Sequence, residues 1–192
     1  ERSVGENNMS KTSLDYTLLL LITAVIYLPF LGVAAWDGNE PLRVIIAKDM
    51  LKTGNLAIPM LHGQPYFVKP PLMNWLIAGS ISVFGTLNEW TTRFPSVLAS
   101  FLTAVAVYAL AGKWFSRWGR LFAALGTLTM FSIIQKGTSA EIDSILILVT
   151  ALSCLLWING YLRQWRPVYT WSVSLFVLGV AFLAKGPQSP AY

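Results

Sequence analysis

Five long apolar segments alternate with polar connections along the chain, and the longest polar stretch separates the first segment from the second. The apolar segments cover residues 14–35, 95–112, 121–135, 142–159 and 169–184. A helix that crosses a bilayer needs about 20 apolar residues. The third segment has 15, so it requires its flanks or a thinned membrane. The pattern predicts an all-α, polytopic membrane protein with about five transmembrane helices.

Composition agrees with this fold class. The chain has 192 residues, of which 55% are hydrophobic and 12% are charged, and its mean hydropathy is +0.57. A soluble domain would have about a quarter of its residues charged, so a soluble globular protein is excluded. The eight Trp and seven Tyr residues lie largely near segment ends, where aromatic rings anchor helices at the membrane interface. The net charge of +5 comes with basic loops, and we expect no nucleic-acid partner.

Charge placement orients the chain. Residues 72–84 are apolar but too short to span, and we expect a helix along the membrane surface. If this segment does not cross, the basic loops 113–120 and 161–167 both lie inside together with the tail 1–13, which places seven of the fourteen Lys and Arg in the cytoplasm. If it crosses, only five remain there. The first arrangement makes residues 36–94 an extracytoplasmic loop that follows a retained first helix.

The start of this loop predicts an amphipathic interfacial helix from Glu40 to about Lys52. Asn39 is placed to cap it, and the sequence Thr53-Gly54-Asn55 ends it. Its apolar face consists of Leu42, Val44, Ile46, Ala47, Met50 and Leu51. Arg43 lies within the apolar arc three residues after Glu40, so an acid and a base face the interior together. The alternative is a surface ion pair worth under about 1 kcal/mol.

Two further charged positions stand on the outer side. Residues 66–71, Tyr-Phe-Val-Lys-Pro-Pro, are rigid because of the two prolines, and they hold Lys69 beside the membrane, where it can meet a lipid phosphate. The alternative is a lysine that only anchors to headgroups. Asp143, close after Glu141, begins a membrane helix. Its alternative role is to complement the helix dipole.

The order of several short blocks resembles a known family. The blocks are M-L-x-x-G, G-x-P-Y-x-x-K-P-P-L, W-L-I-A, F-G, N-E, R-x-P-S and L-A-K-G-P, within residues 30–187. Together they resemble the N-terminal half of C-type glycosyltransferases, especially bacterial relatives of protein O-mannosyltransferase and of lipid A aminoarabinose transferase. The resemblance implies two helices parallel to the membrane in the first outer loop. It also implies sugar transfer from a polyprenyl-phosphate donor to a lipid, glycan or protein acceptor at a bacterial inner membrane.

By this resemblance Lys69 is the phosphate-binding lysine and Asp143 is the second acidic position. The sequence departs from the family at two places: Asn39-Glu40 stands where an Asp-Glu pair is common, and Val68 stands where Glu often precedes the lysine. An amide cannot accept a proton from an acceptor hydroxyl. Glu40 is therefore the candidate base, with Asp37 in reserve, unless catalysis has been lost.

The implied chemistry assigns the remaining candidates. Transfer requires deprotonation of an acceptor hydroxyl, stabilisation of positive charge at the anomeric carbon and neutralisation of the leaving phosphate. The carboxylates of Glu40 and Asp143 suit the first two tasks. The residues expected to bind substrate are Lys69, Arg43, Arg93, Tyr66 and Lys185. No metal ligands are assigned, and a divalent cation is left open as a cofactor.

Family members continue past the A-K-G-P block, so the resemblance predicts that this chain is the N-terminal portion of an enzyme. The competing interpretation is a non-catalytic membrane scaffold or an accessory subunit of a larger membrane complex. Further membrane spans in the complete protein would favour the enzyme.

Overall fold

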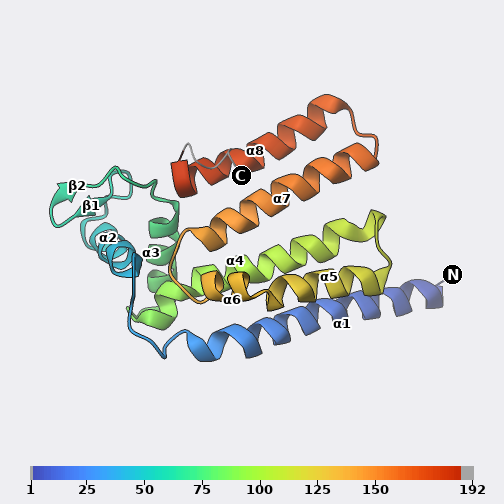
Figure 1. Ribbon diagram of the computed structural model, residues 1–192, viewed down its shortest axis with the longest axis horizontal. Helices are drawn as coiled ribbons and strands as arrows, with labels where there is room; N and C mark the ends of the chain where they lie inside the picture. The colour runs from blue at the N-terminus through green and yellow to red at the C-terminus, as the bar shows by residue number, and fades with distance from the viewer. Residues whose placement is uncertain (1, 187–192) are drawn as a thin grey trace.

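The computed structural model describes residues 2–186, and helices dominate it (Figure 1). The bundle consists of α1 (Arg2–Tyr27), α4 (Glu89–Leu110), α5 (Arg117–Thr129), α6 (Phe131–Gly137), α7 (Asp143–Leu162) and α8 (Pro167–Lys185). Short 3-10 turns follow α1 at Leu28–Phe30 and α4 at Ala111–Lys113. Helices α2 (Glu40–Thr53) and α3 (Leu72–Phe84) lie across one end of the bundle, with a small antiparallel hairpin of β1 (Met60–Leu61) and β2 (Gln64–Pro65) between them. The expected all-α membrane fold is confirmed.

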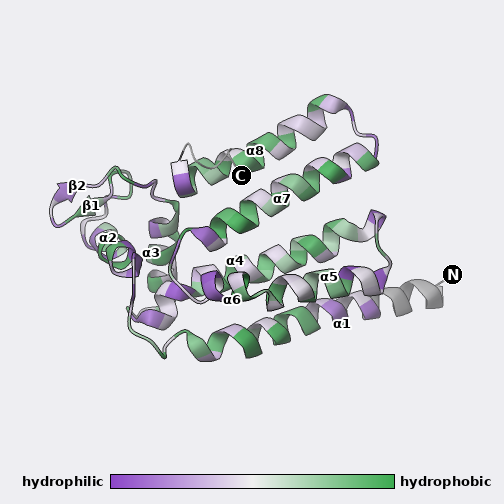
Figure 2. Ribbon diagram, in the orientation of Figure 1, coloured by the Kyte–Doolittle hydropathy of each residue, from purple (hydrophilic) through white to green (hydrophobic). Residues whose placement is uncertain are grey.

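Four helices of the described residues are long and apolar enough to cross a membrane: Lys11–Phe30, Glu89–Lys113, Asp143–Leu162 and Pro167–Lys185. The expected third span is interrupted. Helix α5 ends at Thr129 and α6 begins at Phe131, because Met130 has an extended backbone with φ −62° and ψ 127°. Figure 2 shows apolar residues along both pieces. That residues 121–135 cross the membrane stays a prediction.

Two helix boundaries differ from those expected. The first segment was predicted to reach Ala35, but α1 ends at Tyr27, since Pro29 has no N–H to continue the hydrogen-bond ladder. The second was predicted to begin at Pro95, but α4 begins at Glu89. Asn88 accepts a hydrogen bond from the Thr91 N–H, and the Thr91 side chain accepts one from the Asn88 N–H, which forms a capping box. This early start extends α4 toward the end of the bundle near α2.

The two basic loops lie at the same end of the bundle. The α4–α5 and α7–α8 connections lie at the end where α1 begins, opposite α2 and α3 (Figure 1). At the end that carries these loops, Asp15 is 2% exposed and accepts hydrogen bonds from Arg117 at 2.6 and 2.7 Å and from the Tyr108 hydroxyl. This network joins α1, α4 and α5. The common position of the loops 113–120 and 161–167 agrees with the arrangement in which both lie on the same side of the membrane.

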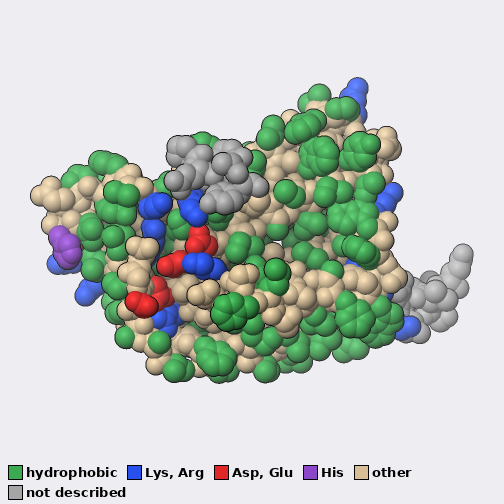
Figure 3. Space-filling model, viewed as in Figure 1, with side chains coloured by type: hydrophobic (Ala, Val, Ile, Leu, Met, Phe, Trp, Pro, Cys, Tyr) green, Lys and Arg blue, Asp and Glu red, His purple; other side chains and the backbone are tan. Residues whose placement is uncertain are grey.

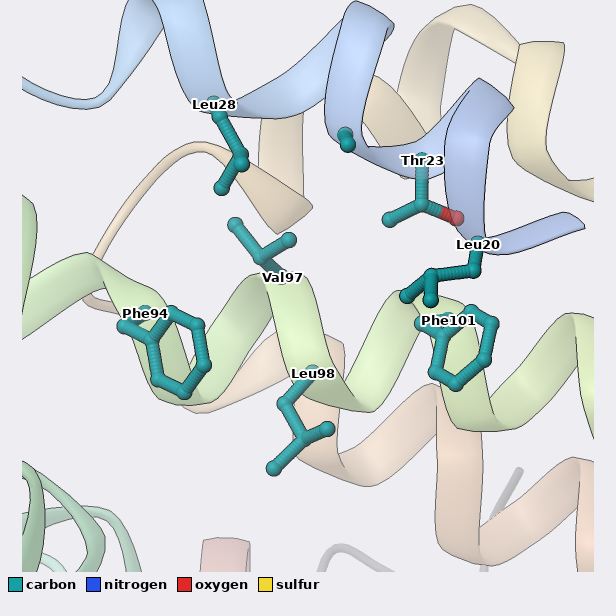
Figure 4. A pocket seen from close by; sticks show the side chains of 8 residues that line it. Leu20, Thr23, Leu28, Phe94, Val97, Leu98 and Phe101 are labelled. Atoms are coloured by element: carbon teal, nitrogen blue, oxygen red, sulfur yellow. The ribbon is translucent and has the colours of Figure 1, made fainter. Parts of the chain in front are cut away.

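The flanks of the bundle are apolar. Phe131 and Phe176 are among the large hydrophobic residues that remain exposed, and Figure 3 shows such side chains over much of the surface. A shallow groove of about 120 Å³ lies between α1 and α4 (Figure 4) and is lined by Leu20, Leu28, Phe94, Val97, Leu98 and Phe101. The one hydroxyl there, from Thr23, donates to the Leu19 carbonyl at 2.7 Å. Such a lining suits hydrocarbon, so polar chemistry belongs at the ends of the bundle.

We predict that the end carrying α2 and α3 faces the outside. In a Cys154→Ser background, a cysteine at exposed Thr86, in the turn after α3, should react with a membrane-impermeant maleimide added outside intact cells. A cysteine at exposed Lys113 should react only after the membrane is opened. The reverse labelling would overturn the orientation.

Candidate functional site

Helix α2 begins and ends where the sequence predicted. It starts at Glu40, and Gly54 takes the left-handed conformation at φ +73° directly after Thr53. The expected cap differs, because the Asn39 side chain makes no capping hydrogen bond. The Glu40 N–H donates instead to the Asp37 carbonyl at 3.0 Å, and the Asp37 N–H donates to the Glu40 carboxylate at 3.0 Å. A main-chain and side-chain exchange between these two residues therefore fixes the first turn of α2.

The predicted apolar face of α2 is largely confirmed. Val44, Ile46, Ala47 and Met50 are buried, whereas Leu51 at the end of the helix is 41% exposed. Arg43 is buried on the same face, as its position in the apolar arc predicted. The helix therefore packs its apolar face inward and brings both Glu40 and Arg43 to the end of the bundle.

Glu40 forms a buried ion pair with Arg93 of α4. Arg93 donates through Nε to Oε1 at 2.8 Å and through one terminal nitrogen to Oε2 at 2.7 Å. Both residues are at most 4% exposed. The alternative interpretation, a surface ion pair between Glu40 and Arg43, is not what the structure shows. Arg93 lies 53 residues away and matches the carboxylate with a two-point geometry that strengthens the contact.

The same ion pair connects four parts of the chain. The remaining donors of Arg93 reach the carbonyls of Leu31 and Ala34 at 2.7 and 2.8 Å and that of Ala35 at 3.1 Å, in the segment between α1 and α2. Glu40 Oε1 also accepts the Ala140 N–H at 2.6 Å, just before α7. Arg93 was expected to bind substrate, but in the described residues its donors are used to hold the fold together.

These contacts bear on the hypothesis that Glu40 is the general base. Burial raises the pKa of Glu40, but the hydrogen bonds from Arg93 and from the N–H groups of Ala140 and Asp37 outweigh it and hold the pKa below its ordinary value. Each carboxylate oxygen already accepts two hydrogen bonds. A substrate hydroxyl could approach only if this ion pair opened. The arrangement suits a structural anchor better than a base.

Arg43 is the unsatisfied cation of the site. It is 4% exposed, and its Nε and one terminal nitrogen have no hydrogen-bond partner among residues 2–186. Burial lowers its pKa, while the nearby Tyr66, Glu141 and Asp143 act in the opposite direction. Buried donors without partners are rare in native proteins. Arg43 therefore has capacity to bind an anion or a polar ligand that enters beside these three residues.

Asp143, at the first turn of α7, is held by two lysines. Its Oδ1 lies 3.0 Å from the Lys185 Nζ of α8, and its Oδ2 lies 3.1 Å from the Lys136 Nζ of α6. Lys136 also contacts Glu141 at 2.8 Å. Figure 3 shows acidic and basic side chains gathered on one face of the molecule. The cluster forms a half-exposed polar surface beside the buried Glu40–Arg93 pair.

A pocket of about 270 Å³ opens next to this cluster. Lys69 and Lys185 both line it. The rest of its lining is Ala57, Pro59, Tyr66, Phe67, Val68, Pro70, Pro71 and Gly186. Two ammonium groups against aromatic and proline walls suit a phosphate attached to an apolar chain.

Asp37, the reserve candidate, is exposed at the start of the loop. Its Oδ1 accepts the Gly38 N–H at 2.6 Å. Gly38 has φ +57°, a conformation that favours glycine, and a Cβ there would lie 3.7 Å from Glu141 Oε1. The turn thus brings the residue after Asp37 close to Glu141 of the Asp143 cluster.

The structure therefore divides the predicted site residues into two groups. Lys69, Tyr66 and Lys185 share the pocket, and Asp143 and Arg43 lie beside it. Glu40 and Arg93 form the buried anchor below. In the part of the chain that the structure describes, no three His, Cys, Asp or Glu side chains form a group suited to a metal ion. Lys136, which is not among the predicted site residues, forms salt bridges with both Glu141 and Asp143.

Known proteins share the sequence pattern of this chain. The dolichyl-phosphate-mannose-protein mannosyltransferase family matches residues 68–192. Undecaprenyl phosphate-alpha-4-amino-4-deoxy-L-arabinose arabinosyl transferase 2 of Proteus mirabilis is 30% identical over 183 residues, which are 93% of this chain and 33% of that protein. The corresponding transferase of Pseudomonas savastanoi is 32% identical over 176 residues, 90% of this chain and 33% of that protein. The chain spans about a third of these curated relatives.

Solved structures share the fold. Crystal structures of ArnT from Cupriavidus metallidurans, in the apo state and bound to undecaprenyl phosphate, each superpose with a TM-score of 0.79 at 22% sequence identity. They cover 90% and 91% of this chain, and 33% of the ArnT chain in each case. At this level of identity the likeness establishes a common arrangement of helices.

We predict that Glu40→Gln destabilises the protein by about 3–5 kcal/mol, because it leaves Arg93 buried without its counter-ion. A chemical or thermal unfolding series in detergent would measure the loss. Asp49→Asn, on the polar side of the same helix, is the matched control and should stay within about 0.5 kcal/mol of wild type. Equal stability of the Glu40→Gln variant and wild type would show that the ion pair contributes nothing.

The same ion pair predicts acid sensitivity. The folded-state pKa of Glu40 lies below its ordinary value, so its contribution to stability is complete above the unfolded pKa, about 4.3. This contribution is lost as the pH falls through the lower folded-state pKa. Unfolding measured from neutral pH down to about pH 3 should show a smaller acid loss in Glu40→Gln than in wild type. Parallel pH dependences would contradict the assignment.

Proposed function

Since the chain belongs to the dolichyl-phosphate-mannose-protein mannosyltransferase family, we propose that it forms part of an integral membrane glycosyltransferase. The enzyme would transfer a sugar from a polyprenyl-phosphate donor to a lipid, glycan or protein acceptor outside the cytoplasm. The names of the relatives from Proteus mirabilis and Pseudomonas savastanoi support an undecaprenyl-phosphate donor. The inner membrane of a bacterium is the location that we propose.

The observation that carries the proposal is the pocket shared by Lys69 and Lys185. It opens between the loop that follows α2 and the end of α8, directly beside the Asp143 carboxylate. The two ammonium groups would neutralise the phosphate, while Phe67 and the prolines accommodate the first carbons of the lipid chain. A cationic pocket next to a carboxylate supplies the two charges that the transfer of a phosphate-linked sugar requires.

We assign roles from the contacts of each group. Asp143 is the leading base, since it is half-exposed and adjoins the pocket, and Asp37 is the second candidate, since its side chain is exposed. Arg43 would donate to the sugar or to the phosphate with its unpartnered nitrogens. Glu40, although expected to be the base, would position α2 through Arg93. In this scheme the loss of an acid at position 39 is compatible with catalysis.

The second candidate function is a non-catalytic scaffold or accessory subunit in a larger membrane complex. One observation favours it: Asn39 stands at the usual acidic position, and both Glu40 and Asp143 are already paired with cations. The two functions differ in turnover. A purified complete protein without transferase activity on polyprenyl-phosphate sugars, but with intact lipid binding, would favour the scaffold.

Lys69→Gln in the complete protein should weaken binding of undecaprenyl phosphate by about ten- to a hundred-fold, because one charge-assisted contact to the phosphate is lost. Binding can be measured by microscale thermophoresis in detergent. Lys48→Gln, an exposed lysine of α2, is the control that removes the same charge from the same loop. Unchanged affinity in the Lys69→Gln variant would reduce Lys69 to a headgroup anchor.

Asp143→Asn should reduce turnover by about 10²- to 10⁴-fold with donor binding retained, the range for a positioned general base. The amide keeps the size of the carboxylate but cannot hold the proton. Turnover is measured by mass spectrometry of the glycosylated acceptor. If the Asp143→Asn variant keeps full turnover while Asp37→Asn loses it, the base is Asp37.

A further inference from the structure

Lys185 stands between the Asp143 carboxylate and the pocket. Its Nζ lies 3.0 Å from Asp143 Oδ1, and the same side chain lines the pocket that Lys69 shares. Its side chain is 19% exposed and that of Asp143 is 28% exposed. One ammonium group therefore adjoins both the carboxylate and the place where we propose the donor phosphate binds.

Lys136 provides a natural comparison. It contacts the other oxygen of Asp143 at 3.1 Å and Glu141 at 2.8 Å, but it does not line the pocket. The two lysines approach Asp143 from different flanking helices, α6 and α8, at nearly equal distances. They differ in what else each can reach, because the ion-pair partners of Lys136 in the described residues are both carboxylates.

Asp143 is a weaker base while ammonium groups contact both of its oxygens, because they stabilise the ionised carboxylate. A lysine that leaves the carboxylate must find another anion, since an unpaired ammonium in a partly desolvated place is costly. A donor phosphate in the pocket would offer Lys185 such an anion, with negative charge and several acceptor oxygens. Lys136 does not line the pocket, and its contacts with Glu141 and Asp143 do not depend on a ligand there.

We propose that Lys185 couples donor binding to the freeing of Asp143. When the phosphate enters, Lys185 turns from Asp143 toward the phosphate and leaves the carboxylate with Lys136 alone. One oxygen of Asp143 is then open to an acceptor hydroxyl. Before the donor arrives, both oxygens are paired with lysines and Asp143 is a weak base toward an acceptor hydroxyl. This inference rests on the proposed function and adds an order of events: the donor binds first, and the acceptor is engaged afterwards.

The charged groups around Asp143 agree with this exchange. Lys136 comes from α6, Glu141 from the connection before α7, Lys185 from α8, and Arg43 from α2, with Tyr66 of the loop close to Arg43. When Lys185 leaves, the Asp143 carboxylate keeps its contact with Lys136 and stays near Arg43. The cost of moving Lys185 is thereby limited.

The test is carbodiimide cross-linking of the complete protein in detergent. A water-soluble carbodiimide joins a lysine to a carboxylate with which it is in contact, and peptide mass spectrometry quantifies each link. Without ligand, the Lys185–Asp143 and Lys136–Asp143 links should both form. With saturating undecaprenyl phosphate, the Lys185–Asp143 link should fall several-fold while the Lys136–Asp143 link is retained. The second link in the same sample corrects for reagent consumed by the phosphate.

Two controls isolate the phosphate and the lysine. Undecaprenol, which has the same chain without the phosphate, should leave both links unchanged. Lys185→Gln should weaken binding of undecaprenyl phosphate by about ten- to a hundred-fold, whereas Lys136→Gln should leave it within about twofold.

The outcomes separate the coupling from the function beneath it. If undecaprenyl phosphate binds and the Lys185–Asp143 link is undiminished, or if both links fall equally, the coupling is overturned and the proposed function stands. The same holds if undecaprenol lowers the link as much as the phosphate does. If undecaprenyl phosphate does not bind at all, the proposed function fails, and the coupling fails with it.

Discussion

The buried ion pair between Glu40 and Arg93 is the interaction on which the end of the molecule that carries α2 and α3 depends. It joins the segment after α1, the start of α2, the first turns of α4 and Ala140, in the connection before α7, through seven hydrogen bonds. A charge in this position is costly to bury, and it is tolerated because every acceptor position of the carboxylate is used. The two loop helices are thereby fixed across the end of the bundle, and their position determines where Arg43 and Lys69 stand.

Above this anchor the charges are less completely matched. Arg43 keeps two unpartnered nitrogens among the described residues, and Asp143 shares its oxygens between two lysines from different helices. A fully satisfied group holds a fold in place, whereas a group with spare or exchangeable contacts can respond to a ligand. The contrast separates Glu40 from Asp143, although both are acids at the same end of the bundle.

Much of the fold could be predicted from sequence because the local signals are strong. The bounds of α3 agree with the expected residues 72–84, since Pro-Pro precedes the helix and Gly85 follows it in the left-handed conformation. The start of α4 was missed because the capping box at Asn88 and Thr91 is polar and lies outside the apolar segment. The end of α1 was missed because the hydrophobic run continues past Pro29 although the helix does not. The pairings of the candidate site residues could not be predicted: spacing along one helix offered Arg43 as an alternative partner of Glu40, and periodicity carries no information on a contact with Arg93, 53 positions away.

The pairings change which acid can do chemistry. A base must offer an oxygen that a hydroxyl can reach, and it must hold the proton once transferred. Glu40 offers none while Arg93 and Ala140 occupy it. Asp37 offers one at an exposed turn, but it does not line the pocket that Lys69 and Lys185 share. Asp143 lies beside the pocket, and its partner Lys185 also lines that pocket, where a donor phosphate would be an alternative anion. Under the proposed function, the base should act only after the donor has bound. A carboxylate that is paired with an exchangeable lysine meets this requirement, whereas a carboxylate that is always free does not.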